Sequence, residues 1–290
     1  MYEKPCIVHV ISGSHKIQKV TIRLATAACA AFFLYAVAAR GQSWPSNADV
    51  FRDVYGRMDA SGTSVRWDSS KESKPSPYVG HPFAETGQAM NVGILLRAEV
   101  DGRLYVATSA VPKGEPTEYQ CHSCVAAVGG AVYSRTNGTW KLQASAPAAI
   151  YGGGWGDPPT RIDLRSCGPE TYCFAVEDSF SGQGYSESTL KVFGPVGGSL
   201  QALLSVPSES DNAGAYDPRG VDGPDMWKRM SASMRFLSDY NSKSPFFDLE
   251  LIGAQRSCSK GHCRSSWKHR RYRYREGRYV AINLGASPGQ

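Results

Sequence analysis

The sequence lacks the short motifs that commonly mark a catalytic centre. It has no G-x-S-x-G nucleophile elbow, no H-E-x-x-H zinc-protease motif and no P-loop for phosphate. It also shows no alternation of strands with helices, which removes the α/β folds that hold many cofactors. We therefore expect a non-catalytic protein without a cofactor or a bound metal, and we keep a secreted hydrolase as the alternative.

Histidine is scarce as well. Only four histidines follow residue 38, namely His81, His122, His262 and His269. Two of them flank cysteines and one lies in a basic stretch, so a Ser-His-Asp triad would have to use His81 or a loop histidine. Glu177 and Asp178, near Tyr185, suggest a glycosidase, but adjacent residues on a strand point to opposite faces.

No apolar run reaches the about twenty residues that a membrane-spanning helix needs. The longest run, residues 24–39, follows three basic residues and ends in small side chains. This pattern predicts a signal peptide that is removed after residue 38, and hence a secreted or periplasmic protein. A retained membrane anchor is the alternative. Because residues 1–19 make the leader unusually long, a translation start at Val20 is a further hypothesis.

Positive charge is concentrated near the C-terminus. Residues 1–38 carry four Lys or Arg and one Glu, which leaves 28 basic and 25 acidic residues in the rest of the chain. Nine basic residues and a single Glu fall within residues 256–278. We therefore expect a mildly acidic body with a basic C-terminal patch.

Six cysteines remain after the leader, and they form three close pairs. The pairs are Cys121/Cys124, Cys167/Cys173 and Cys258/Cys263. An even cysteine count in an exported protein indicates disulfides, and each spacing suits a bridge across a turn or hairpin. A redox site at Cys121/Cys124 is one alternative. A zinc site is another, and its candidate ligands are Cys121, Cys124, Cys258, His262 and Cys263.

The strand and turn signals predict an all-β protein with one short N-terminal helix. Apolar residues recur at helical spacing from Val50 to Met58, and Ser46 with Asp49 forms a capping box. Residues 61–80 are polar and are interpreted as a connector. We expect a leader over residues 1–38, the helix and linker over 39–80, and a single β-rich domain over 81–290.

Antiparallel meanders are expected in the β-rich domain. Asp101-Gly102, Asn137-Gly138 and Gly197-Gly198 are typical hairpin turns. Residues 228–284 alternate between apolar and polar side chains, which predicts a four-stranded meander. We expect these strands to pack as a sandwich or an irregular double sheet, and a propeller-like arrangement is the alternative.

Two loops are interpreted as ordinary turns. Residues 151–159 are rich in glycine but lead into prolines, which does not fit a phosphate-binding loop. A second loop contains Asp211, Asp217, Asp222 and Asp225. Its carboxylates could bind calcium, but they lack a recognised ligand spacing.

The basic C-terminal strands provide the candidate binding site. Tyr272 and Tyr274 share one face of their strand, and three arginines share the other. A three-residue turn at residues 275–277 would pair Tyr272 with Val280 and keep the arginines off the apolar side. We predict that turn, with the arginines projecting toward water or a partner.

Arginine recognises carboxylate and phosphate groups through paired hydrogen bonds. The predicted anion-binding residues are Trp267, Lys268, Arg271, Arg273 and Arg275. An anionic glycan or lipid of the cell envelope is the expected partner, whereas nucleic acid is not, because no nucleic-acid-binding signature is present. The structural alternative is that these cations protect an exposed strand from edge pairing.

Overall fold

The computed structural model describes seven stretches of the chain. They are residues 43–56, 58–68, 86–114, 124–216, 227–238, 244–259 and 262–282. Contacts divide the chain into Met1–Ser43 and Trp44–Gln290, and the second unit is the one described below. The predicted leader lies outside the described residues, so its cleavage stays a prediction. In these seven stretches, no helix has the length and hydrophobicity needed to cross a membrane.

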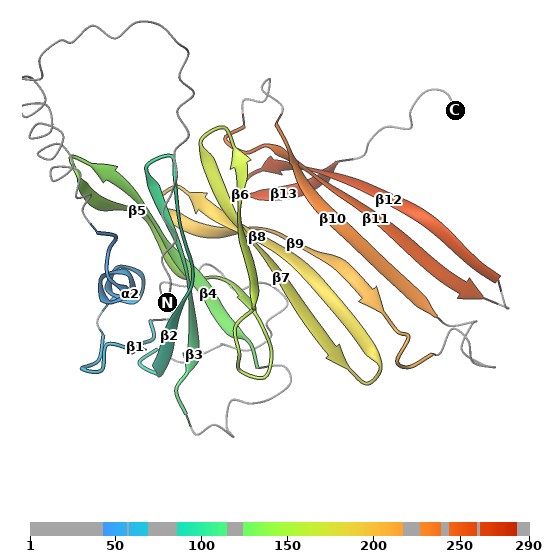
Figure 1. The fold of residues 1–290 in the computed structure, drawn as a ribbon, viewed down its shortest axis with the longest axis horizontal. Coiled ribbons are helices and arrows are strands. Elements are labelled where there is room, and N and C mark those ends of the chain that lie inside the picture. Colours follow the sequence, from blue (N-terminus) through green and yellow to red (C-terminus); the bar gives the residue numbers. More distant parts are fainter. Residues whose placement is uncertain are drawn as a thin grey trace, which may run out of the picture. The chain divides into compact units, whose positions relative to one another are not determined.

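One helix and thirteen strands make up the described part of the chain (Figure 1). The helix α2 spans Asn47–Tyr55. The strands are β1 (Ser64–Arg66), β2 (Ala89–Val100), β3 (Arg103–Pro112), β4 (Ala126–Thr136), β5 (Thr139–Gly152), β6 (Arg161–Gly168), β7 (Thr171–Gly182), β8 (Tyr185–Val196), β9 (Ser199–Asp211), β10 (Lys228–Leu237), β11 (Asp248–Ser259), β12 (His262–Arg275) and β13 (Arg278–Ile282). The predicted all-β class is confirmed.

The strands form three antiparallel meanders of four strands each, β2–β5, β6–β9 and β10–β13. A parallel contact between Ser145 and Ser199 joins β5 to β9, and the end of β9 pairs with the start of β10. The hydrogen-bonded path from β1 to β13 is therefore one open sheet rather than a closed barrel. The predicted meander over residues 228–284 corresponds to β10–β13.

Two-residue turns with positive φ at both positions connect many of the strands. Asp101-Gly102, Asn137-Gly138 and Gly197-Gly198 take this conformation, as their sequence predicted. Gln183-Gly184 and Glu276-Gly277 take it as well. Glutamine and glutamate rarely occupy the left-handed region, which is why these two turns carry a weaker sequence signal.

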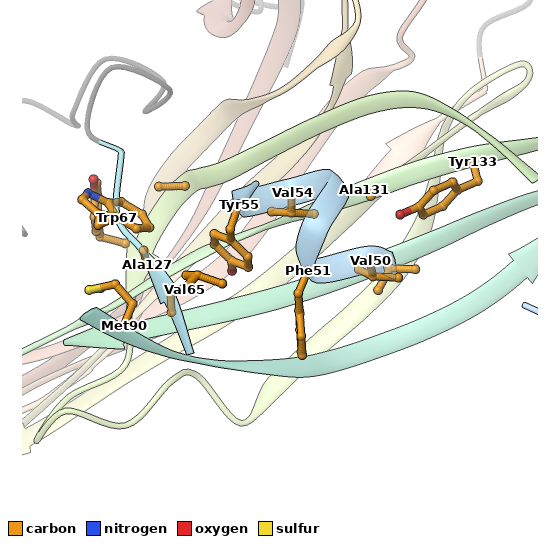
Figure 2. Packing of buried hydrophobic residues seen from close by; sticks show 14 of the residues in the cluster. Val50, Phe51, Val54, Tyr55, Val65, Trp67, Met90, Ala127, Ala131 and Tyr133 are labelled. Atoms are coloured by element: carbon orange, nitrogen blue, oxygen red, sulfur yellow. The ribbon is translucent and has the colours of Figure 1, made fainter. Parts of the chain in front are cut away.

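Three hydrophobic clusters pack the helix and the three meanders against one another. The first lies between α2 and one face of β1–β5, and it includes Val50, Val54 and Met90 (Figure 2). The second fills the space between the other face of β2–β5 and the middle meander, where Phe174 and Phe193 stack with ring centroids 4.7 Å apart. The third joins the opposite face of β6–β9 to β10–β13. The part of the middle meander that contacts these two clusters is therefore buried on both faces.

The N-terminal segment belongs to this layered core. Ser46 caps α2, since its side-chain oxygen accepts a hydrogen bond from the Asp49 amide at 3.2 Å, and the Asp49 carboxylate accepts one from the Ser46 amide. The predicted capping box is thus confirmed. β1 lies within the predicted polar connector, where Val65 is 2% exposed and pairs with Met90 of β2. Residues 69–80 of that connector lie outside the described residues.

Candidate functional site

The five predicted anion-binding residues lie on both faces of β12. Alternation along the strand places Trp267, Arg271, Arg273 and Arg275 on one face, which we call the arginine face. Lys268 lies on the opposite face, together with Arg270 and the core residues Tyr272 and Tyr274. The sequence-predicted residues are therefore not one site but two.

Arg271 and Arg273 share a single carboxylate, that of Asp248 on the neighbouring strand β11. Arg273 donates hydrogen bonds to Asp248 from Nε at 3.1 Å and from Nη2 at 3.0 Å. The Nε of Arg271 lies 3.2 Å from Asp248 Oδ2. The Asp248 side chain is only 3% exposed, so these two arginines neutralise a buried acid.

A second buried acid lies next along the same face. The carboxylate of Glu250 contacts both Arg235 of β10 and His269 of β12. Burial raises the pKa of Glu250, but the hydrogen bonds and positive charges of Arg235 and His269 outweigh this effect and hold the pKa below its ordinary value. Arg235, His269, Arg271 and Arg273 therefore each pair with a buried carboxylate on this face.

The predicted three-residue turn of the C-terminal hairpin is wrong. Arg275 pairs directly with Arg278, and Glu276-Gly277 forms a two-residue turn with φ of 50° and 88°. Arg273 therefore lies opposite Val280, an arrangement that we expected to be costly. It is tolerated because Asp248 supplies the counter-charge, and because Tyr279, 6% exposed, faces the core in place of Val280, which is 38% exposed.

This register places like charges side by side at the end of β12. Arg275 and Arg278 are cross-strand neighbours, and both are exposed. Directly opposed like charges destabilise a strand pair. An anion that bound between them would remove that repulsion.

Lys268 and Arg270 line a hollow between β9 and the C-terminal meander. The lining residues are Pro207, Met230, Ala232, Leu251, Gly253, Ala254, Lys268 and Arg270. The sequence identified Lys268 but missed Arg270. Strand alternation was the signal that could have found it, because it groups Arg270 with Lys268 rather than with Arg271.

Trp267 stands outside the packed parts of the sheet. It is 80% exposed, the largest exposure among the large hydrophobic side chains of the described residues. Alternation places it on the arginine face, at the far side of His269 from Arg271. It is available for stacking on a partner, but it lies away from Lys268.

Two of the three predicted cysteine pairs are disulfides. Cys258 and Cys263 are cross-strand partners in the β11–β12 hairpin with Cα atoms 4.0 Å apart. Cys167 and Cys173 bridge the β6–β7 hairpin with Cα atoms 5.8 Å apart. Cys121 lies outside the described residues, so its pairing with Cys124 stays a prediction.

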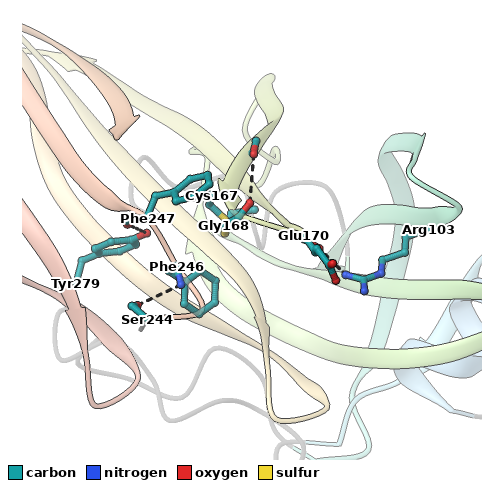
Figure 3. Close-up of a disulfide and its surroundings, with 10 residues drawn as sticks. Arg103, Cys167, Gly168, Glu170, Ser244, Phe246, Phe247 and Tyr279 are labelled. Carbon is teal, nitrogen blue, oxygen red and sulfur yellow. Dashed lines mark hydrogen bonds between the residues drawn. A yellow bond between two sulfur atoms is a disulfide. The ribbon is translucent and has the colours of Figure 1, made fainter. Parts of the chain in front are cut away.

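The β6–β7 disulfide region also holds the C-terminal meander in place (Figure 3). The Phe247 amide donates to the Cys167 carbonyl at 2.7 Å, and the Tyr279 hydroxyl donates to the Phe247 carbonyl at 2.8 Å. Gly168 permits this close approach, because a Cβ there would lie 2.2 Å from the Pro245 carbonyl oxygen. β6, β13 and the segment that leads into β11 are thus fixed relative to one another.

The alternative catalytic and metal sites receive no support from the contacts. Asp178 forms an ion pair with Lys191 at 2.5 Å and accepts a hydrogen bond from the Gly153 amide, both structural roles. Glu177 pairs instead with Arg161 at 2.7 Å. The Cys258–Cys263 disulfide removes two of the proposed zinc ligands. Among the described residues, no group of three or more His, Cys, Asp or Glu could hold a metal ion.

Most of the predicted calcium loop is not described by the structure. Asp217, Asp222 and Asp225 lie outside the described residues, as do His81 and His122. Asp211 accepts hydrogen bonds from the Ala213 amide at 2.8 Å and from Trp227 Nε1 at 3.2 Å. The bond from Ala213 is typical of an Asx turn at a strand end, and the bond from Trp227 ties this turn to the residue before β10.

The chain was compared with protein-family models, with curated protein sequences and with solved structures. None of the three comparisons found a match.

Proposed function

We propose that the protein is an exported, non-catalytic domain that binds an anionic component of the cell envelope through its C-terminal meander. Two disulfides support export, because such bridges persist in oxidising compartments. The predicted leader supports the same destination.

The observation that carries the proposal is the surplus of positive charge on β10–β13. The described residues from 227 to 282 contain eleven Lys or Arg against three Asp or Glu. Asp248 and Glu250 neutralise only three of these cations, Arg235, Arg271 and Arg273. The surplus includes Lys268, Arg270, Arg275 and Arg278. Such a surplus attracts polyanions and concentrates them at this surface.

Retention on immobilised heparin and on lipopolysaccharide, measured in a sodium chloride gradient, tests the proposal. Wild-type protein should bind at low salt and elute as the screening length falls from about 10 Å at 0.1 M to about 3 Å at 1 M. Two charge-reversed pairs should elute earlier, Lys268→Glu with Arg270→Glu and Arg275→Glu with Arg278→Glu.

The matched control is Lys113→Glu with Lys141→Glu. It reverses two exposed charges outside the C-terminal meander, because Lys113 directly follows β3 and Lys141 lies in β5. It makes the same change in net charge. If the control elutes as early as the C-terminal variants, attraction is due to net charge alone and the proposal fails. The proposal also fails if the wild-type protein is not retained at low salt.

A further inference from the structure

The hollow beside Lys268 exists because β9 and β10 separate. They pair only over three positions, from Glu209 with Ser231 to Asp211 with Arg229 (Figure 1). Pro207 precedes these paired residues on β9. A proline has no amide hydrogen to donate to a neighbouring strand. From that point β10 continues next to β11 only, and the hollow lies beside Pro207, between β9 and the C-terminal meander.

Small side chains at the floor of the hollow keep it open. On the core face, Phe236, Leu249 and Tyr272 are cross-strand neighbours and fill the third hydrophobic cluster. Two rows further along, the equivalent positions are Ala232 and Gly253. The side chains on this face become smaller from the row of Phe236 and Leu249 to the row of Ala232 and Gly253. The smaller side chains leave the space that forms the hollow.

Two cations border this apolar floor. Lys268 is the cross-strand neighbour of Gly253, and Arg270 is the neighbour of Leu251. No Asp or Glu of the described residues lies within ion-pair distance of either side chain. Arg271 and Arg273, by contrast, form ion pairs with Asp248. Lys268 and Arg270 therefore place uncompensated positive charge on the face that carries the hollow.

We propose that the hollow binds a single-chain amphiphile with a phosphate headgroup. This inference rests on the proposed function and names the ligand class of one of its surfaces. Lys268 and Arg270 would hold the headgroup, since a phosphate monoester carries a charge of about −1.5 to −2 at neutral pH and thus matches two cations. Met230, Ala232, Leu251 and Pro207 would contact the alkyl chain.

Both parts of such a ligand are needed for binding. Each methylene group that leaves water strengthens binding about fourfold. The phosphate supplies the orientation, because an arginine binds phosphate oxygens through paired hydrogen bonds while the lysine acts as a point charge. A polyanion without an alkyl chain would contact the two cations but leave the apolar residues of the hollow exposed to water.

Isothermal titration calorimetry with dodecyl phosphate, below its micelle concentration, tests the inference. Inorganic phosphate and dodecyl maltoside serve as probes for the headgroup and the chain alone. Dodecyl phosphate should bind at least about tenfold more tightly than either, as expected when both parts contribute. Lys268→Glu with Arg270→Glu should weaken its binding at least about tenfold, and Lys113→Glu with Lys141→Glu should leave it unchanged.

A filling substitution separates this inference from the proposed function. Ala232→Phe blocks the floor and keeps both cations, so it should abolish dodecyl phosphate binding while heparin retention persists. Met230→Gln is a milder variant that makes the floor polar, and it should weaken dodecyl phosphate binding if Ala232→Phe fails to fold.

Three results would overturn the inference: equal binding of inorganic phosphate, equal binding of dodecyl maltoside, or unchanged binding by both floor variants. If heparin retention is observed and dodecyl phosphate does not bind, the amphiphile is wrong but the anion-binding function stands. If neither binds, both proposals fail.

Discussion

Asp248 should be essential to the stability of the C-terminal meander. The substitution Asp248→Asn keeps the size of the side chain and removes its charge. It leaves Arg271 and Arg273 without their shared counter-ion, and the Arg271 side chain is only 28% exposed. Part of the sheet would then carry uncompensated charge close to the core.

The size of the effect follows from the exposure of the three side chains. Breaking a fully buried ion pair costs about 3–5 kcal/mol. Asp248 is buried, but the Arg273 side chain is 46% exposed and can recover water, so the lower end of the range applies. We expect a loss of about 3 kcal/mol in the free energy of unfolding, or about 6–12 °C in Tm for a domain of this size.

Urea denaturation followed by circular dichroism measures this loss. Asp163→Asn is the matched control, because it removes an arginine partner from a pair whose side chains are 56% and 65% exposed. That change should cost about 0–1 kcal/mol. If the two variants are equally stable, Asp248 does not neutralise the arginines as described. A second readout is heparin retention, which should move to higher salt because Arg271 and Arg273 are released.

Three further predictions address other contacts of this region. The stability that Glu250 supplies is complete above its ordinary pKa of 4.5 and is lost as the pH falls through the lower pKa of the folded state. In urea denaturation, Glu250→Gln should therefore lose less stability on acidification than the wild-type protein does. An unchanged pH profile would contradict the ion pairs of Glu250. Tyr279→Phe removes a buried hydroxyl donor and should cost about 1–2 kcal/mol in urea denaturation, whereas a neutral result would show that its bond to the Phe247 carbonyl contributes little. Replacing Cys258 and Cys263 together by serine should cost about 2 kcal/mol, because the closed loop is short, and a protein without β-type circular dichroism would refute this local role.

Local features of the fold were accessible from the sequence. The capping box at Ser46, the three glycine-containing turns and the alternation of β10 depend on residues that lie close together in the chain. Each of these patterns has a steric or hydrogen-bonding cause within a few residues. The helix, the hairpins and the all-β class could therefore be predicted.

Features that depend on distant contacts could not be predicted in the same way. The register of the last hairpin depended on Asp248, because an acid on β11 makes arginines acceptable beside Val280. Asp248 and Glu250 alternate with Leu249 and Leu251, so the sequence did place both acids on one face. Their pairing with β12 had to be known before that alternation could indicate which arginines are neutralised.

The sequence predicted packed sheets, but it could not indicate which strands form which layer. Burial of β6–β9 on both sides depends on β2–β5 and β10–β13 together, and hydrophobic clusters of this kind arise between segments far apart in the chain. The same limit applies to the hollow, whose walls come from β9 and from β10–β12.

The double burial of the middle meander has a practical consequence for anyone who wishes to isolate the C-terminal strands as a small binding module. Cutting before β10 would uncover the residues of β6–β9 that belong to the third hydrophobic cluster, including Cys167, Val192 and Leu203. The remaining fragment would expose an apolar surface that favours aggregation. The excised strands would lose the packing contacts of Leu249 and Tyr272. Ligand studies on this protein therefore require the three meanders to stay in a single polypeptide.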